Sequence, residues 1–314
     1  MKSQPHQFRA AIEEAAERIA PYVRRTPTVT LTAGDLGLET SVTLKLECLQ
    51  HTGSFKARGA FNNLLRNRVP PSGVNAASGG NHGIAVAYAA QVLGHKAEIF
   101  VPEISSPVKV QRLRDYGAEV NVIGATYAEA LEVSETRVRE TGALVVHAYD
   151  QLEAIAGQGT TARELEEQEG GFDTLIVAVG GGGFIGGIAA WHKGKTRIIA
   201  VEPKACPTLH TAQERGAPVD IEVSGIAADA LGARRIGDYG FSIAKAYIER
   251  TVLVEDAAIR DAQLRLWREL RVVAEPSGAT ALAALTSGAY KSVPGERVGV
   301  MVCGSNVDLA TLIG

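Results

Sequence analysis

The stretch VAVGGGGFIGG at residues 177–187 joins an apolar run to four consecutive glycines and then to a second apolar segment. Glycine lets backbone N–H groups approach an anion closely, and the N-terminus of a helix adds a favourable dipole. The pattern therefore predicts a strand, a phosphate-binding loop and a helix. A tight turn without a ligand is the alternative, but four glycines exceed what a turn requires.

The same alternation of short apolar runs and helical segments extends along the chain from about residue 73. Runs rich in Val and Ile, such as AEIFVP at 97–102, alternate with segments whose apolar residues recur about every 3.6 positions, such as HGIAVAYAAQVLG at 82–94. This predicts an α/β protein with parallel sheets covered by helices. Ligands of such sheets bind at the carboxyl ends of the strands. Three glycine-rich loops fall at such ends, at 78–81, 180–183 and 303–306.

The composition excludes several classes of protein. The 314 residues carry a net charge of −3, which argues against a nucleic-acid surface, and no apolar run is long enough to span a membrane. The N-terminal segment 1–23 has the pattern of an amphipathic helix and lacks the apolar core of a secretory signal. Cys48, Cys206 and Cys303 fit neither a zinc site nor a disulfide framework. A cytoplasmic location is therefore predicted.

The stretch HTGSFKARGA at residues 51–60 contains a single lysine, Lys56. A lysine taken in isolation is usually a solvated surface charge. A reactive amine would need a cofactor, and a pocket of low polarity that lowers its pKa. The ten residues themselves do not decide between these interpretations.

The tetraglycine also satisfies a second template. Gly181, Gly183 and Gly186 spell G-x-G-x-x-G, and Glu202 follows about twenty residues later. That is the fingerprint of a nicotinamide-dinucleotide site with its acidic ribose partner. A run of glycines matches many templates, and this one explains neither the other glycine loops nor the stretch around Lys56.

Five blocks taken together resemble a known family. They are SFKARGA (54–60), SGGNHG (78–83), GGGGFIGG (180–187), EPSGATALAAL (275–285) and CGSNVDL (303–309), with AGQGT (156–160) as a further match. In this order they resemble the threonine and serine dehydratases and serine racemase, which are pyridoxal-phosphate enzymes of the tryptophan-synthase β-like fold (fold type II). The resemblance implies an α/β fold of two three-layer αβα domains with a cleft between them. It places a large cofactor-binding domain at residues 1–64 and 147–314 and a small inserted domain at 65–146, and implies a homodimer.

The resemblance also assigns roles to particular residues. Lys56 is the implied Schiff-base lysine and the base for the substrate's α-proton. The glycines Gly180, Gly181, Gly182 and Gly183 are expected to hold the cofactor phosphate through their N–H groups. Phe55 would flank the ring and Asn81 would bond its hydroxyl, although simple core packing explains Phe55 equally well.

Further residues are expected around the substrate and the cofactor ring. The substrate carboxylate would lie against Ser78, Gly79, Asn81 and His82 at a helix start. For His82, a purely structural role is the alternative. Cys303 stands where the family places a neutral partner of the pyridine nitrogen. Glu275 would lie near the ring edge, and a helix-start carboxylate before Pro276 is the alternative.

The sequence departs from the family pattern at two informative positions. Serine racemase carries a serine in the place of Gly79, on the face of the cofactor opposite the lysine. Racemisation needs an acid or base on each face, so one-sided elimination is favoured here. The metal-binding relatives use a glutamate that matches Glu202, but the acidic residue expected after it is Thr208. We therefore expect no metal site and a helix-start or turn role for Glu202.

The sequence thus predicts a lyase that deaminates small β-hydroxy amino acids, turning L-threonine into 2-oxobutanoate and L-serine into pyruvate. A serine racemase or a 3-hydroxyaspartate dehydratase with the same site is the first alternative. A nicotinamide-dependent dehydrogenase and a non-catalytic sensor are further alternatives. The biosynthetic threonine dehydratases carry a C-terminal regulatory domain, and this chain ends five residues after its last matching block, which favours a degradative or broad-specificity enzyme.

Overall fold

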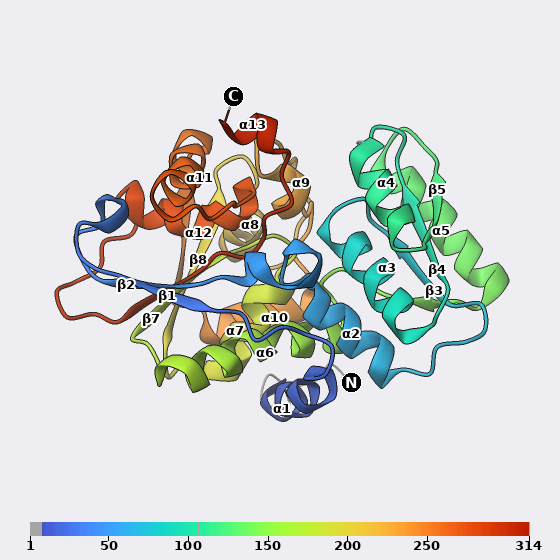
Figure 1. Ribbon diagram of the computed structural model, residues 1–314, viewed down its shortest axis with the longest axis horizontal. Helices are drawn as coiled ribbons and strands as arrows, with labels where there is room; N and C mark the ends of the chain where they lie inside the picture. Colours follow the sequence, from blue (N-terminus) through green and yellow to red (C-terminus); the bar gives the residue numbers. More distant parts are fainter. Residues whose placement is uncertain (1–7, 106, 314) are drawn as a thin grey trace.

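Two separate β-sheets organise the chain in the computed structural model, which describes residues 8–105 and 107–313 (Figure 1). The larger sheet has the strand order β1-β2-β10-β7-β8-β9, and the smaller has the order β5-β4-β3-β6. Strand β1 pairs antiparallel with β2, and all other pairings are parallel. The larger sheet contains β1 (Thr28–Leu31), β2 (Val42–Lys45), β7 (Thr174–Ala178), β8 (Arg197–Pro203), β9 (Arg250–Val254) and β10 (Val298–Met301).

Helices cover both faces of the larger sheet because side chains alternate between its faces. Leu175 and Val177 of β7 pack into one apolar cluster, and Ile176 and Ala178 pack into another. The first cluster includes buried residues of α1 (Phe8–Ile19), α6 (Leu152–Glu169), α7 (Gly183–His192) and α10 (Asp238–Tyr247). The second includes those of α11 (Asp256–Leu270) and α12 (Pro276–Thr286).

The smaller sheet is layered in the same way. It contains β3 (Val74–Ala77), β4 (Ala97–Val101), β5 (Glu119–Val122) and β6 (Leu144–Val145). Val74 and Ala76 pack against α2 (Lys56–Arg66), α3 (Asn81–Leu93) and α4 (Pro107–Asp115). On the opposite face, the Asn75 amide oxygen accepts a 2.6 Å hydrogen bond from Ser134 of α5 (Tyr127–Thr141). Both sheets therefore form αβα layers, as the sequence predicts.

The remaining described elements are short, and the domain boundaries stay a prediction. The short helices are α8 (Thr208–Arg215), α9 (Ala228–Leu231) and α13 (Leu309–Ile313), with single 3-10 turns at Asp35–Gly37, Glu47–Leu49 and His51–Gly53. All strands of the smaller sheet lie between the predicted boundaries at 65 and 146, whereas α2 crosses the first of them. Helix α1 begins at Phe8, and residues 1–7 of the expected N-terminal helix lie outside the described part of the chain.

Helix α6 lies against α2 and α7 at positions where glycine leaves room for the neighbouring backbone. A Cβ added to Gly157 would lie 2.6 Å from the Arg58 carbonyl oxygen of α2. A Cβ on Gly187 of α7 would lie 2.5 Å from the backbone nitrogen of Gly159. These glycines therefore let α2, α6 and α7 pack backbone to backbone, and the AGQGT block belongs to this crossing.

The three glycine-rich loops follow strands, as the sequence predicts. Residues 78–80 lie between β3 and α3, residues 179–182 lie between β7 and α7, and residues 302–308 follow β10. Among the described residues, no helix is long and apolar enough to cross a membrane.

Candidate active site

Lys56 is the first residue of α2, and its side chain reaches the segment that follows β6. Its Nζ donates a 2.7 Å hydrogen bond to the carbonyl oxygen of Ala148. Desolvation by burial lowers the pKa of Lys56 from 10.5 to about 8, and the nearby Cys303 opposes this shift. The amine therefore loses its proton more readily than a solvated lysine, as attack on a carbonyl requires.

The glycine loop and the lysine stretch meet through two aromatic rings. Phe55 immediately precedes Lys56, and Phe184 immediately follows Gly183. Their rings stack with centroids 4.0 Å apart and planes 21° apart. Segments separated by more than a hundred residues are thereby placed side by side. The contact agrees with the interpretation that Phe55 is a packing residue. A position of Phe55 beside the cofactor ring stays a proposal.

The tetraglycine loop offers free backbone donors at the start of α7. The N–H groups of Gly180, Gly181 and Gly182 have no acceptor within the described part of the chain. Gly182 has φ +91°, a backbone conformation that disfavours residues with a Cβ. Free N–H groups at the N-terminus of a helix favour a phosphate. The loop therefore fits the predicted anion site.

The loop is lined by Tyr149, which lies one residue beyond the carbonyl that holds Lys56. A Cβ added to Gly181 would lie 2.3 Å from Cγ and Cδ1 of the Tyr149 ring. The Tyr149 hydroxyl donates to the Arg235 carbonyl oxygen over 3.3 Å. Glycine is thus required at 181 because an aromatic ring occupies the space of a side chain.

The other predicted loops are joined by a chain of amides and carboxyls. Asn81 Nδ2 donates to Glu275 Oε1 over 2.6 Å, and Asn306 Nδ2 donates to Asn81 Oδ1 over 2.6 Å. The backbone nitrogen of Phe55 donates to the Cys303 carbonyl oxygen over 3.2 Å. The lysine stretch, the 78–83 block and the last two blocks therefore meet at one place.

The carboxylate loop provides short polar groups at the start of α3. Ser78 Oγ accepts the Gly80 N–H over 3.3 Å. Gly79 does not have a positive φ, and a Cβ there would lie 3.1 Å from Ser105 Oγ. Gly79 therefore has no conformational need for glycine, and a hydroxyl lies close to the position of its absent side chain.

His82 is buried and bonded to the backbone. Its Nε2 lies 2.7 Å from the Val146 carbonyl oxygen and must donate to it, because a carbonyl only accepts. Burial, together with the charge of Lys56, lowers the pKa of His82 to about 3. The imidazole is therefore neutral near pH 7. Its contact with a substrate carboxylate stays a proposal, and the observed bond gives it a structural role.

Cys303 lies buried at the end of β10, with its Sγ 3.4 Å from the Ser277 carbonyl oxygen. Burial raises the pKa of this thiol, and the neighbouring Glu275 raises it further. The side chain is therefore a neutral thiol near pH 7, which is the state expected of a neutral partner for a ring nitrogen.

Glu275 is the residue before α12, yet its carboxylate makes no capping bond to that helix. Its Oε1 accepts from Asn81 and, over 2.7 Å, from the Ser277 hydroxyl. Burial raises the pKa of Glu275 from 4.5 to about 7. The carboxyl group of Glu275 therefore points towards Asn81. Glu275 does stand at the start of a helix, but its carboxyl group does not cap that helix.

Replacing Glu275 with glutamine is expected to weaken the dependence of stability on pH. Because the folded-state pKa of this acid is raised, its contribution is fully present below pH 4.5 and is lost as the pH rises through about 7. The free energy of unfolding of the apoenzyme, from urea titrations at pH 5 and pH 8, should fall less in Glu275→Gln than in the wild type, by about 2–3 kcal/mol. Equal falls in both proteins would contradict the shifted pKa.

Glu202 lies near the end of β8, and its carboxylate accepts hydrogen bonds from the first turn of α8. Its two oxygens accept the N–H groups of Leu209 and His210 over 2.7 and 2.8 Å. Burial raises the pKa of Glu202 to about 8. The helix-start role that the sequence left open for Glu202 is therefore observed. Because both of its oxygens are occupied by these bonds, Glu202 is not free to bind a ribose, as the dinucleotide fingerprint would require. The residues that the structure describes contain no group of three His, Cys, Asp or Glu placed to hold a metal ion.

The arrangement fits a phosphorylated aldehyde cofactor. It combines a lysine of lowered pKa, free N–H donors at a helix start, and a neutral thiol. The sequence provided no signal for Ala148 and Tyr149, because a carbonyl oxygen and a single tyrosine have no distinctive motif. Their only indication was their position shortly before the AGQGT block.

Comparisons with known proteins agree with this arrangement. A family model described as "Pyridoxal-phosphate dependent enzyme" matches residues 19–304. Phenylserine dehydratase from Ralstonia pickettii is 36% identical over 307 residues, covering 96% of this chain and 94% of that protein. L-threonine ammonia-lyase from Geobacter sulfurreducens is 35% identical, covering 96% and 76%. The structure of maize serine racemase superposes with a TM-score of 0.91 at 36% identity, covering 97% of this chain and 95% of that one.

These matches confirm the predicted fold class and the dependence on pyridoxal phosphate. They replace the nicotinamide interpretation of Gly181, Gly183 and Gly186. They also bring together dehydratases, ammonia-lyases and a racemase, so the family alone does not select one reaction. The chain belongs to the family of pyridoxal-phosphate dependent enzymes.

Proposed function

We propose that the protein is a deaminating dehydratase of small β-hydroxy amino acids. It would convert L-threonine into 2-oxobutanoate and ammonia, and L-serine into pyruvate and ammonia. One observation carries the proposal: Lys56 offers an amine of lowered pKa, whereas Gly79, on the face expected opposite the lysine, offers no side chain. One-sided proton transfer favours elimination over racemisation.

When bound, pyridoxal phosphate withdraws electrons from the substrate's α-carbon. The Lys56 amine takes the α-proton, because a pKa of about 8 leaves part of it unprotonated near neutral pH. The N–H groups of Gly180–Gly183 would hold the phosphate, and the neutral Cys303 thiol would serve as the partner of the ring nitrogen. The start of α3, with Ser78, Gly79 and Asn81, orients the substrate carboxylate.

Racemisation is the second candidate because a hydroxyl lies close to Gly79. The ideal Cβ position of Gly79 is 3.1 Å from Ser105 Oγ, so Ser105 lies where a serine at 79 would extend. Ser105 would then supply the acid on the second face. The relatives include serine racemases from rice and Arabidopsis thaliana.

A substrate panel tests both candidates. Threonine, serine and 3-hydroxyaspartate are incubated with the holoenzyme, and ketoacid and enantiomer products are both measured. We expect ketoacid to exceed the opposite enantiomer by at least ~10-fold, and Ser105→Ala to leave its formation within ~3-fold. Predominant enantiomer formation that Ser105→Ala abolishes would establish the racemase instead. A homodimer and a cytoplasmic location remain predictions from the sequence.

A further inference from the structure

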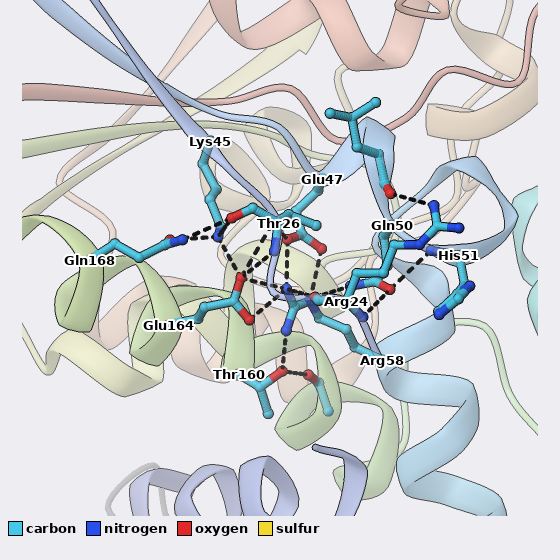
Figure 2. A network of polar contacts seen from close by, with 12 residues as sticks. Arg24, Thr26, Lys45, Glu47, Gln50, His51, Arg58, Thr160, Glu164 and Gln168 are labelled. Carbon is cyan, nitrogen blue, oxygen red and sulfur yellow. Dashed lines mark hydrogen bonds and ion pairs between the residues drawn. The ribbon is translucent and has the colours of Figure 1, made fainter. Parts of the chain in front are cut away.

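Four charged side chains are buried together at the junction of β2, α2 and α6 (Figure 2). We call Lys45, Glu47, Arg58 and Glu164 the charge quartet. The side chains of Lys45, Glu47 and Arg58 are 0, 0 and 1% exposed, and that of Glu164 is 13% exposed. Two cations balance two carboxylates, and the quartet lies outside the cofactor site.

Arg58 makes the central contacts of the quartet. Its Nε and Nη2 donate to the two oxygens of Glu47, each over 2.8 Å. Nη2 also lies 3.0 Å from both oxygens of Glu164, and Nη1 donates to the Thr160 hydroxyl over 3.3 Å. Burial alone would raise the pKa of Glu47, but the guanidinium outweighs it and lowers that pKa. Arg58 is therefore charged and held from two sides.

Helix stability does not explain this arrangement. Arg58 lies in the first turn of α2, where the helix dipole disfavours a cation. The turn contains no acidic residue, and its N-cap residue, Phe55, makes no side-chain capping bond. Buried ion pairs are often no more stable than apolar residues of similar volume. We infer that the contacts of Arg58 with Glu47 and Glu164 instead fix the position of the first turn of α2.

Glu47 and Glu164 hold the first turn of α2 from two different elements of the fold. Glu47 begins the 3-10 turn that follows β2 after one residue, and Glu164 lies within α6. At the next residue, a Cβ on Gly59 would lie 2.4 Å from Gln158 Nε2 of α6, so the two helices are already in contact there. The turn therefore has little freedom to shift along either neighbour.

The turn that is held in this way carries Lys56. The same helix also fixes the partner of that lysine, because Asn63 Nδ2 donates over 2.8 Å to Gln151 Oε1, which accepts the His147 N–H over 2.9 Å. The segment 147–151 includes Ala148, whose carbonyl oxygen holds Lys56 Nζ. We propose that Arg58, through the charge quartet, is a positioning residue that holds Lys56 for its reaction with the cofactor. The inference rests on Lys56 being the reactive lysine of the proposed function.

The test removes the contact without leaving a buried charge. Arg58→Met alone would strand Glu47 and is expected to be strongly destabilised. The double variant Arg58→Met/Glu47→Gln keeps the quartet neutral, because Lys45 and Glu164 remain paired over 2.5 Å. The matched control is Arg197→Met/Glu296→Gln, which removes a 2.7 Å pair that involves no residue of α2.

Three measurements are made on each protein: the melting temperature, kcat and KM, and the rate at which added pyridoxal phosphate becomes fixed to Lys56 of the apoenzyme on borohydride reduction. The quartet variant is expected to melt below the control variant, because the Arg58 side chain is 1% exposed and that of Arg197 is 47% exposed, so labelling is measured at a temperature at which both variants remain folded. Its kcat and its labelling rate should fall by ~10- to 100-fold while KM changes by less than ~3-fold, because a displacement of about 1 Å costs that much. Arg58→Lys should give an intermediate labelling rate.

Labelling of the quartet variant within ~2-fold of the wild type would overturn the proposal, and so would an equal loss in the control. The labelling rate does not depend on the substrate. The labelling result would therefore be the same if the proposed substrate were wrong. Labelling of another lysine in the wild type would instead show that the proposed role of Lys56 is wrong.

Discussion

Replacing Lys56 with alanine is expected to lower kcat by about 10³-fold or more without unfolding the protein. Lys56 both binds the cofactor and moves the α-proton in the proposed reaction, and a positioned acid or base alone contributes ~10²- to 10⁴-fold. Removing a half-buried amine whose pKa is lowered by desolvation also relieves an unfavourable burial, so the melting temperature should not fall much. Steady-state kinetics and a thermal melt provide the measurement.

The control for this variant is Lys204→Ala. Lys204 is an exposed lysine that pairs with Glu255 over 2.5 Å, so its loss should leave kcat within ~2-fold. Unchanged ketoacid formation by Lys56→Ala would exclude the proposed role. Such a result would mean that a different amine reacts with the cofactor.

The order of strands, loops and helices around the site was predictable from the sequence. Apolar alternation identified strands such as β4 and β7, and glycine marked the turns at strand ends. This information is local, because the period of a strand or helix is expressed within ten residues. The meeting of the loops at one place followed from the rule for parallel sheets, and the contacts of Asn81 with Glu275 and Asn306 agree with it.

Other features were not predictable because they depend on distant backbone groups. Ala148 contributes only a carbonyl oxygen, which every residue possesses. The bond between the His82 ring and the Val146 carbonyl oxygen has no sequence signal either, and it leaves the predicted contact of His82 with a substrate carboxylate a proposal. Arg58 looked like part of a motif, but Glu47 and Glu164 determine its role from separate elements. In each case the partner is determined by tertiary packing, which the period of a single segment does not reveal.

Placing a methyl group on Gly181 tests the phosphate loop directly. The new Cβ would lie 2.3 Å from two ring atoms of Tyr149, closer than any tolerated contact, so the ring or the loop must move. The Tyr149 hydroxyl is bonded to Arg235, and the backbone of Tyr149 lies against Gly183, which restrains the ring. Gly181→Ala should therefore weaken pyridoxal-phosphate binding by ~10- to 100-fold, since overpacking costs about 1–3 kcal/mol.

Gly186→Ala is the matched control, because its Cβ would lie 3.6 Å from Ile243 Cδ1, an ordinary contact. It should bind the cofactor within ~3-fold of the wild type and gain slightly in helix stability. The double variant Gly181→Ala/Tyr149→Ala removes the ring that the methyl group meets, so it should bind more tightly than Gly181→Ala. If cofactor titration by fluorescence shows equal losses in both, the loop itself is disturbed and Tyr149 is not the cause. Recovery in the double variant would mean that glycine is required at 181 because Tyr149 packs against the loop that holds the phosphate.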